Sequence, residues 1–384
     1  MKQLTRRILP ACLIGLLLLP VFGMPVQAES NVLTLQISDV RQFTAYHVLK
    51  NDGTVWEFTK KGLAQVQGLK NVIAVASKAG NALALQSDGT VWAWGSNSFG
   101  QLGDATLERR DTPGKVLELS DVIAISVGDG YSVASKNDGT VWAWGHNWRG
   151  QLGDGTIDNQ RLPVRVIGPS DIVTIDAGTY HSLGLDSDGG VWTWGNLASG
   201  TPGVQSMSDV VAIAAGSGYS LMLKNDGVLW ACGSNTSGQL GDNTNASRPK
   251  PVQVFDYHLG KVKAIASGGH YSVAIKTDGT VWTWGYNDYG ELGDPTRTDV
   301  RVPHQVEGIS NAVAIASGSF HTLVLLEDGT MQGFGRDGDW QKAANPGNNA
   351  SVRYIGNTTY KATLWNWFMY FFFLGFIWMN LSVR

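Results

Sequence analysis

Glycine-rich segments of this chain contain residue types from which phosphate-binding loops are built. One of them, Asn147–Asp154, reads Asn-Trp-Arg-Gly-Gln-Leu-Gly-Asp. Glycine lets a backbone approach a phosphate closely, but such a loop also needs a lysine after the glycines and the N-terminus of a helix. No lysine follows here, and no helical pattern opens. The segment recurs with the same Asn, Gly, Leu, Gly and Asp, whereas a nucleotide site is normally made once. We therefore interpret it as a structural loop, present as Asn97–Asp104, Asn147–Asp154, Asn235–Asp242 and Asn287–Asp294.

The histidines and the second cysteine also have structural explanations. His181 and His321 share their position in the repeat with tyrosines and one asparagine, which favours a hydrogen-bonding role in the core. Cys232 occupies a position held elsewhere by tryptophan, so we expect it to be buried. Single carboxylates spread over different repeats cannot form one calcium site. The sequence shows no catalytic motif, and we predict a protein without enzymatic activity, cofactor or metal.

The chain is organised by a sequence repeat, which would position these residues. Each of its seven copies contains an Asp-Gly pair, and in six copies tryptophan stands at the fifth position counted from the aspartate. The seven aspartates are separated by 36, 50, 50, 38, 52 and 50 residues. Periods of this size are typical of propellers and solenoids. The copies begin at Asp52, Asp88, Asp138, Asp188, Asp226, Asp278 and Asp328.

Each repeat has the pattern of short strands. Ala82–Leu85 and Val91–Trp94 flank Asp88-Gly89, which predicts a hairpin. A further apolar run precedes the hairpin, and a short segment such as Val164–Ile167 precedes that run, so we expect four strands per repeat in this order. Both faces of the strand with the tryptophans are apolar, as packing against two neighbouring sheets requires. The predicted fold is all-β, a seven-bladed β-propeller of four-stranded blades spanning residues 31–341.

The composite motif resembles the regulator of chromosome condensation repeat family. DGTVWAWG is followed after one residue by N-x-x-G-Q-L-G-D, and His-Ser or Tyr-Ser stands seven residues before the aspartate. The resemblance covers roughly Val40 to Gly335 and implies a seven-bladed β-propeller. The first repeat lacks the glycine-rich loop, the fourth has a different loop, and the last replaces tryptophan by Gln332.

The resemblance also suggests functions. The family has a secreted bacterial branch that includes a β-lactamase inhibitor protein, to which this chain is similar in repeat and in acidity. Its nuclear founder is a guanine-nucleotide exchange factor, so regulation of a small GTPase is the alternative hypothesis. Ultraviolet sensing by tryptophan clusters, as in a related plant photoreceptor, is less favoured because packing explains the tryptophans.

The chain ends indicate export. Lys2, Arg6 and Arg7 precede an apolar run, and Val26-Gln27-Ala28 offers a cleavage site, so we expect residues 1–28 to be a signal peptide. Residues 342–361 are interpreted as a linker. Residues 362–384 form an apolar C-terminal segment, in which Thr363–Leu381 is long enough for a membrane-spanning helix. This segment is a candidate membrane anchor, and the alternative is a tail that packs on the propeller.

Charge argues against nucleic acid as a partner. The chain has 29 basic and 32 acidic residues, and removal of the three basic residues of the signal peptide leaves 26 against 32, about −6. We expect a monomer, extracellular or at the cell surface, that binds an unidentified extracellular protein. Aromatic and arginine side chains at variable positions of the glycine-rich loops are typical of protein-binding surfaces. The predicted partner-binding residues are Phe99, His146, Trp148, Arg149, Tyr286, Asp288 and Tyr289.

Overall fold

Asp-Gly turns form hairpins, as the sequence predicts. Asp138 Oδ1 accepts hydrogen bonds from Thr140 N at 3.0 Å and from Thr140 Oγ1 at 2.6 Å. Gly139 has a φ of +77°, which a residue with a side chain rarely adopts. The turn joins β11 (Tyr131–Lys136) to β12 (Val141–Gly145), whose antiparallel register runs from Ser135↔Val141 to Tyr131↔Gly145.

The computed structural model describes residues 33–196, 203–205, 207–255 and 259–336. Within these ranges the chain forms seven four-stranded antiparallel sheets, which confirms the predicted all-β class and the number of blades. Blades 1 to 3 consist of β2 (Val40–Phe43), β3 (His47–Lys50), β4 (Val55–Thr59) and β5 (Gly62–Gln65); β6 (Val72–Lys78), β7 (Asn81–Gln86), β8 (Val91–Gly95) and β9 (Arg110–Lys115); and β10 (Val122–Val127), β11, β12 and β13 (Gln160–Arg165). Blades 4 and 5 consist of β14 (Ile172–Ala177), β15 (His181–Asp186), β16 (Val191–Gly195) and β17 (Gly203–Gln205); and β18 (Val210–Ala215), β19 (Tyr219–Lys224), β20 (Leu229–Gly233) and β21 (Arg248–Gln253). Blades 6 and 7 consist of β22 (Val262–Ser267), β23 (Tyr271–Lys276), β24 (Val281–Gly285) and β25 (Val300–Gln305); and β26 (Ala312–Ser317), β27 (His321–Leu326), β28 (Thr330–Gly335) and β1 (Leu33–Gln36).

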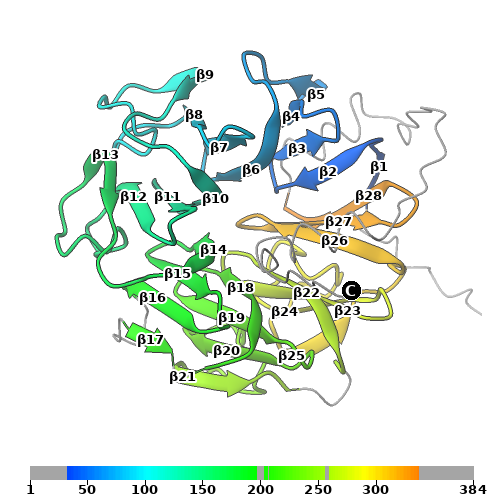
Figure 1. Ribbon diagram of the computed structural model, residues 1–384. Helices are drawn as coiled ribbons and strands as arrows, with labels where there is room; N and C mark the ends of the chain where they lie inside the picture. Colours follow the sequence, from blue (N-terminus) through cyan, green and yellow to red (C-terminus); the bar gives the residue numbers. More distant parts are fainter. Residues whose placement is uncertain (1–32, 197–202, 206, 256–258, 337–384) are drawn as a thin grey trace, which may run out of the picture. The chain divides into compact units, whose positions relative to one another are not determined.

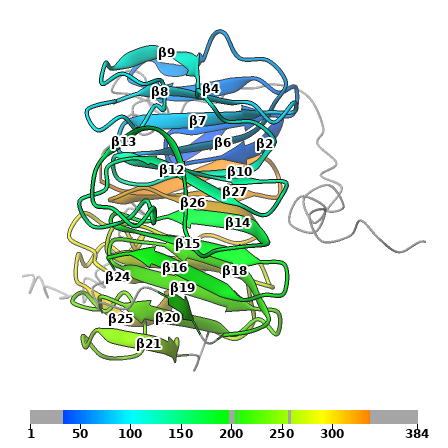
Figure 2. The ribbon, with the colours of Figure 1, turned by 60° about the vertical axis from the view of Figure 1, so that its left-hand side comes forward.

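The first strand of each blade from β2 to β26 lies toward the centre of the ring, and the fourth strand lies at the rim (Figure 1). Seen from another side, successive blades stack face to face (Figure 2). Seven buried apolar clusters lie between neighbouring blades, and each draws side chains from two of them. Packing between blades therefore supplies the core.

The fourth strand has a different place in the repeat from the predicted one. Val164 pairs with Ala143 of β12, so β13 is the rim strand of blade 3 and not the first strand of blade 4. The segment at Val252 likewise pairs with Ala231 of β20 in blade 5. The prediction that these segments open a repeat is wrong, because the glycine-rich loop returns the chain to the sheet that it has just left.

The ring closes through the N-terminal strand. β1 pairs antiparallel with β28, from Leu33↔Gly333 to Gln36↔Thr330, and supplies the fourth strand of blade 7. A sheet edge that the last repeat leaves open is thus covered by a segment from the other end of the propeller.

The tryptophans that alternate along the third strand are not equally buried. Trp144 is 0% exposed and packs among Leu83, Leu102 and Val116 of blade 2. Trp142 is only half-buried, and its Nε1 donates to Thr140 Oγ1 at 3.2 Å near the Asp-Gly turn. Trp142 packs against the same apolar cluster as Trp144, but at the end of the strand near the Asp-Gly turn it keeps part of its ring exposed.

The two ends of the ring carry different connections. One end, the turn face, carries the Asp-Gly turns. The other end, the loop face, carries the turns between first and second strands and the glycine-rich loops between third and fourth strands. The backbone places these two sets together, because His146 N donates to Gly130 O at 2.9 Å and Tyr286 N donates to His270 O at 3.0 Å.

Candidate functional site

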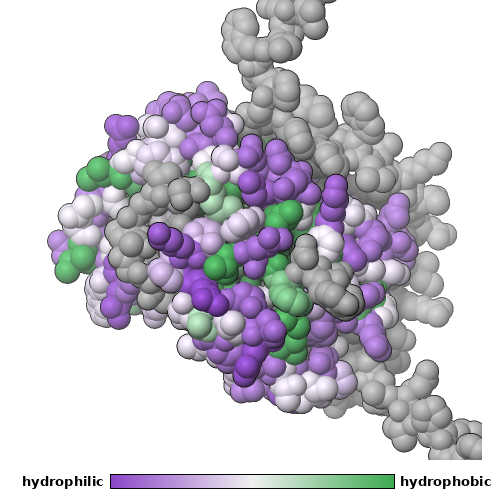
Figure 3. Space-filling model, turned by 90° about the horizontal axis from the view of Figure 1, so that it is seen from below, coloured by the Kyte–Doolittle hydropathy of each residue, from purple (hydrophilic) through white to green (hydrophobic). Residues whose placement is uncertain are grey.

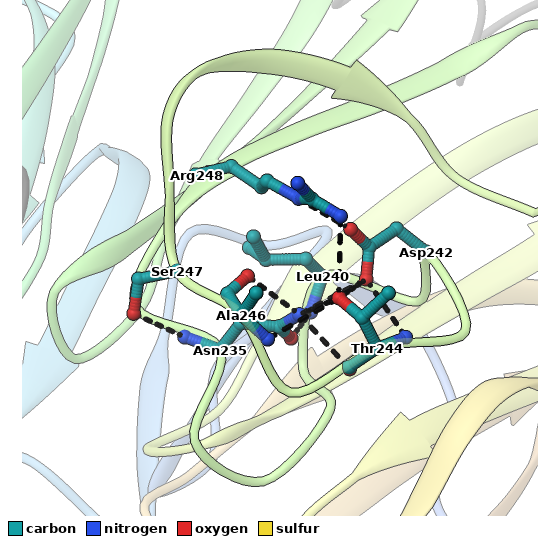
Figure 4. Close-up of polar contacts among 7 residues, drawn as sticks. All are labelled: Asn235, Leu240, Asp242, Thr244, Ala246, Ser247 and Arg248. Atoms are coloured by element: carbon teal, nitrogen blue, oxygen red, sulfur yellow. Dashed lines mark hydrogen bonds and ion pairs between the residues drawn. The ribbon is translucent and has the colours of Figure 1, made fainter.

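The glycine-rich loops are held by their own asparagine. In blade 5, Asn235 Oδ1 accepts from Leu240 N at 2.9 Å, and its Nδ2 donates to Thr244 O at 3.0 Å and to Asp242 Oδ1 at 3.0 Å (Figure 4). Arg248 Nε pairs with Asp242 Oδ2 at 2.7 Å, and Leu240 is buried. The Asn, Asp and Thr side chains of the loop bond within the loop itself, which supports its interpretation as a structural element.

Each loop is also attached to the next blade. Gln101 O, in the loop of blade 2, accepts from both Ser132 Oγ and Trp144 Nε1 of blade 3, each at 2.9 Å. Gly103 in the same loop has a φ of +66°, and a Cβ there would lie 2.9 Å from Trp144 Nε1. The loop is thereby clamped to a buried ring, and the side chains at its tip start from a rigid base.

The histidines predicted to bond in the core do so between blades. Tyr131 Oη donates to His181 O at 2.6 Å, and His181 Nε2 lies 3.0 Å from Ser220 Oγ in the next blade. Tyr271 Oη donates to His321 O, and His321 Nε2 lies 3.1 Å from Ala45 O of blade 1. Burial lowers the pKa of His181 to about 3, so this histidine remains neutral at physiological pH. These residues join neighbouring blades by hydrogen bonds.

Cys232 is buried as predicted, at 1% exposure, and burial raises the pKa of its thiol to about 12. A protonated, inaccessible thiol is a poor nucleophile. In full-length protein carrying Cys12→Ser, we expect no reaction with a disulfide reagent such as DTNB in native buffer and release of one equivalent of thiolate in guanidinium chloride. Rapid reaction of the native protein would contradict this burial.

The first strands of the blades line a central channel, and Lys78 is an unusual residue at its position in the repeat. It stands where five other blades have glycine, and at Gly128 a Cβ would lie 1.9 Å from the Tyr131 ring. Blade 2 has Asn81 in place of that tyrosine, which leaves room for the lysine. Lys78 Nζ donates to Ala177 O of blade 4 at 3.0 Å, and the nearby Asp176 accepts from backbone N–H groups of Ala177 and Ala215. This arrangement bridges blades.

Predicted site residues of blades 2 and 3 come together on the loop face. The Phe99 and His146 rings stack with centroids 4.4 Å apart, and Trp148 meets His146 edge-on at 5.1 Å. Trp148 is nevertheless 67% exposed, and partial burial lowers the pKa of His146. Arg149 is exposed beside Trp148. A large ring held by two others and open to solvent is a suitable anchor for a partner.

Ile157 belongs to the same surface, and the sequence reasoning missed it. Asn147 Nδ2 donates to Thr156 O at 3.1 Å, so the residues that follow each of them, Trp148 and Ile157, stand on one loop tip. Ile157 is 67% exposed. In blade 5 the corresponding residue, Asn245, donates to Thr236 O at 3.1 Å. A comparison of Ile157 with Asn245 in the sequence could have identified this residue, because isoleucine cannot make the hydrogen bond that asparagine makes here. We call Phe99, His146, Trp148 and Ile157 the blade 3 patch.

Predicted residues of blade 6 form a second group with two residues of blade 7. The Tyr289 ring lies 6.2 Å from that of Tyr286 and 5.1 Å from that of Phe320. The Arg336 guanidinium lies 4.8 Å from the centroid of Tyr289. We call Tyr286, Tyr289, Phe320 and Arg336 the blade 6 patch.

Asp288 lies beside this patch and accepts a 2.7 Å hydrogen bond from Tyr286 Oη. The hydrogen bond raises the pKa of Tyr286 to about 12. The predicted residues thus form two patches on different blades and no single cluster. Phe320 and Arg336 come from outside the glycine-rich loops, where the sequence comparison did not look.

Other surfaces carry smaller apolar features. From the β21 side, hydrophobic side chains lie in small groups separated by hydrophilic ones (Figure 3). Among the described residues, no group of three or more His, Cys, Asp or Glu is placed to hold a metal ion. The same residues contain no helix with the length and hydropathy of a membrane span. The predicted signal peptide, linker and C-terminal anchor lie outside the described residues.

Curated proteins match this chain over part of its length. It is 36% identical over 115 residues to the E3 ubiquitin-protein ligase HERC2 of Homo sapiens, which covers 28% of this chain and 2% of that protein. It is 32% identical over 110 residues to the ultraviolet-B receptor UVR8 of Arabidopsis thaliana, which covers 28% of this chain and 24% of that protein. The chain thus spans a minor part of both relatives.

Solved structures share the propeller. Yeast RCC1 (Prp20) bound to Kap60 has a TM-score of 0.66 and 21% identity, over 83% of this chain and 82% of that chain. Human WBSCR16 has a TM-score of 0.62 and 22% identity, over 72% and 79%. These likenesses support the fold. A family model described as an RCC1-like domain matches residues 50–351, most of the chain. The chain therefore belongs to the RCC1-like domain family.

Proposed function

We propose that this chain is an exported, non-enzymatic binding protein that holds an extracellular protein partner on its loop face. The exposure of Trp148 carries the proposal. Its ring is 67% exposed although it contacts His146, and its loop is fixed from within by Asn147, whose Oδ1 accepts from Leu152 N at 3.0 Å. A rigid, exposed tryptophan binds a partner without a large loss of conformational entropy.

The surroundings of Trp148 suit a protein and not a small molecule. Ile157 extends the apolar surface on the same loop, and Arg149 provides an exposed cation next to it. Apolar and aromatic centres with arginine nearby are typical of protein interfaces. The predicted signal peptide supports an extracellular partner, and the acidity of the chain argues against nucleic acid.

Affinity capture tests the proposal. The protein without residues 1–28 is immobilised and exposed to the extracellular proteins of the source culture. The Trp148→Ala and Ile157→Ser variants serve as matched baits. A protein retained by the wild type and lost with both variants supports the proposal. Equal retention by all three baits, each shown to be folded, contradicts the assigned surface.

The alternative, regulation of a small GTPase, has its own readout. One solved relative, Prp20p from Saccharomyces cerevisiae, has binding properties to Gsp1p and histones. Accelerated release of a fluorescent guanine nucleotide from a captured GTPase would support this alternative over simple binding.

A further inference from the structure

Among the four glycine-rich loops, that of blade 6 contains a buried carboxyl group where the other three contain an amide. The position is Gln101, Gln151, Gln239 and Glu291, and each of these side chains is 0–2% exposed. In all four loops the side-chain oxygen accepts from the backbone N–H two residues earlier, at 2.9 Å. For Glu291 that donor is Tyr289 N, in the blade 6 patch.

The second oxygen of Glu291 has no partner among the described residues. Gln151 directs its amide nitrogen to His146 Nδ1 at 3.2 Å. The residue in the place of His146 in blade 6 is Tyr286, whose hydroxyl bonds to Asp288 instead. Oε1 of Glu291 is therefore buried without a hydrogen bond. An ionised carboxylate in this position would bury a charge that one backbone N–H only partly stabilises.

Groups facing Glu291 do not provide a counter-ion. Asp288 on the same loop and Asp299 near β25 both disfavour a further negative charge. Three other neighbours come from the elements packed around this loop. Thr322 Oγ1 of blade 7 donates to the backbone carbonyl of Glu291 at 3.3 Å, Tyr271 belongs to blade 6, and His270 lies on the adjoining turn. Arg336 lies over the rings of Tyr289 and Phe320, and the ion pairs of the described residues do not include Glu291. Burial above all raises the pKa of Glu291 to about 7.

We propose that Glu291 is an acid-dependent latch, which holds the blade 6 patch in its closed arrangement when the carboxyl is protonated and releases it when the carboxyl ionises. The protonated group has the shape of glutamine and matches the three sister loops. The ionised group requires water, which it reaches when the loop tip withdraws and Tyr289 N loses its acceptor. The fraction of closed loop should fall as pH rises through neutrality.

The sign of the effect on stability is defined. Glu291 has a folded-state pKa above its unfolded value, so the folded state binds more protons between the two values. The free energy of unfolding should therefore decrease as pH rises from about 4.5 to about 7 and should not change further through this group. Glu291→Gln removes this dependence.

Amide hydrogen exchange of residues 286–293 tests the latch without a partner. Wild-type protein and Glu291→Gln are compared at pH of about 5.5 and about 8, on either side of the raised pKa. We expect equal protection at the acid pH, and exchange roughly tenfold faster in the wild type at the alkaline pH. The loop Asn235–Asp242, with Gln239, is the internal control and should behave alike in both proteins.

A converse variant strengthens the test. Gln239→Glu should bring the same pH-dependent exchange to the loop of blade 5. The proposal would be overturned if residues 286–293 exchanged equally fast in the wild type and in Glu291→Gln at the alkaline pH.

The consequence for binding rests on the proposed function and is tested separately. The protein captured by the wild type should dissociate at the alkaline pH from the wild type more than from Glu291→Gln. If amide exchange of the wild type depends on pH but Tyr289→Ala captures the partner as well as the wild type does, the latch is supported and the binding role of the blade 6 patch is rejected. If capture of the partner requires Tyr289 but amide exchange does not depend on pH, only the latch is rejected.

Discussion

Trp144→Ala is expected to lower the free energy of unfolding by about 3 to 5 kcal/mol, the range for loss of a buried large aromatic side chain. Trp144 is 0% exposed and fills the interface of blades 2 and 3 against Leu102 and Val116. Its removal also takes one of the two donors from Gln101 O. Guanidinium denaturation, followed by the fluorescence of the remaining tryptophans, measures the change.

Two variants separate the causes. Trp142→Ala should cost clearly less, because that ring is only half-buried and the centroid of the ring lies 5.6 Å from the Lys136 ammonium. Trp144→Phe keeps most of the packing and loses the hydrogen bond to Gln101, which typically contributes about 1 kcal/mol. A greater loss for Trp142→Ala than for Trp144→Ala would show that the cores between blades are not where the structure places them.

Trp148→Ala is expected to weaken partner binding by at least about 2 kcal/mol, or roughly thirtyfold in Kd, as truncation of a central interface tryptophan does. The free energy of unfolding should change by less than about 0.5 kcal/mol, because the ring is largely exposed and its loop is held by Asn147 and Leu152. Calorimetric titration with the captured protein and denaturation of the same variant provide the two numbers.

Tyr289→Ala distinguishes the two patches. Tyr289 is 37% exposed and contacts Tyr286, Phe320 and Arg336, so its removal should reduce stability more than Trp148→Ala does. A partner that covers the whole loop face loses affinity with either variant, whereas one that docks on blades 2 and 3 responds to Trp148 alone. Loss of stability without loss of affinity for Trp148→Ala would reject the assignment of the blade 3 patch.

Local chemistry made much of this molecule predictable. The Asp-Gly pairs locate the hairpins because an aspartate oxygen bonds the N–H two residues later and glycine adopts a positive φ. The glycine-rich loops could be interpreted as structural from their repetition, and the bonds of Asn235 within one loop confirm this. Phe99, His146 and Trp148 were found because the common loop frame does not require rings at those positions.

The all-β class, the seven repeats and the hairpins could be predicted from the sequence, because each depends on a pattern that recurs within every repeat. The burial of His181 and Cys232 could be predicted because the equivalent positions of other repeats hold tyrosine or tryptophan. Only the tertiary structure decided that β13 completes the preceding blade and that β1 closes the ring on β28, because these pairings join segments that lie far apart along the chain. It also decided that Trp144 is fully buried between blades while Trp142 is only partly buried there, and that Ile157, Phe320 and Arg336 join the exposed rings. The physical reason is that burial and contact between blades depend on how neighbouring blades pack, which the periodicity within a single blade does not specify.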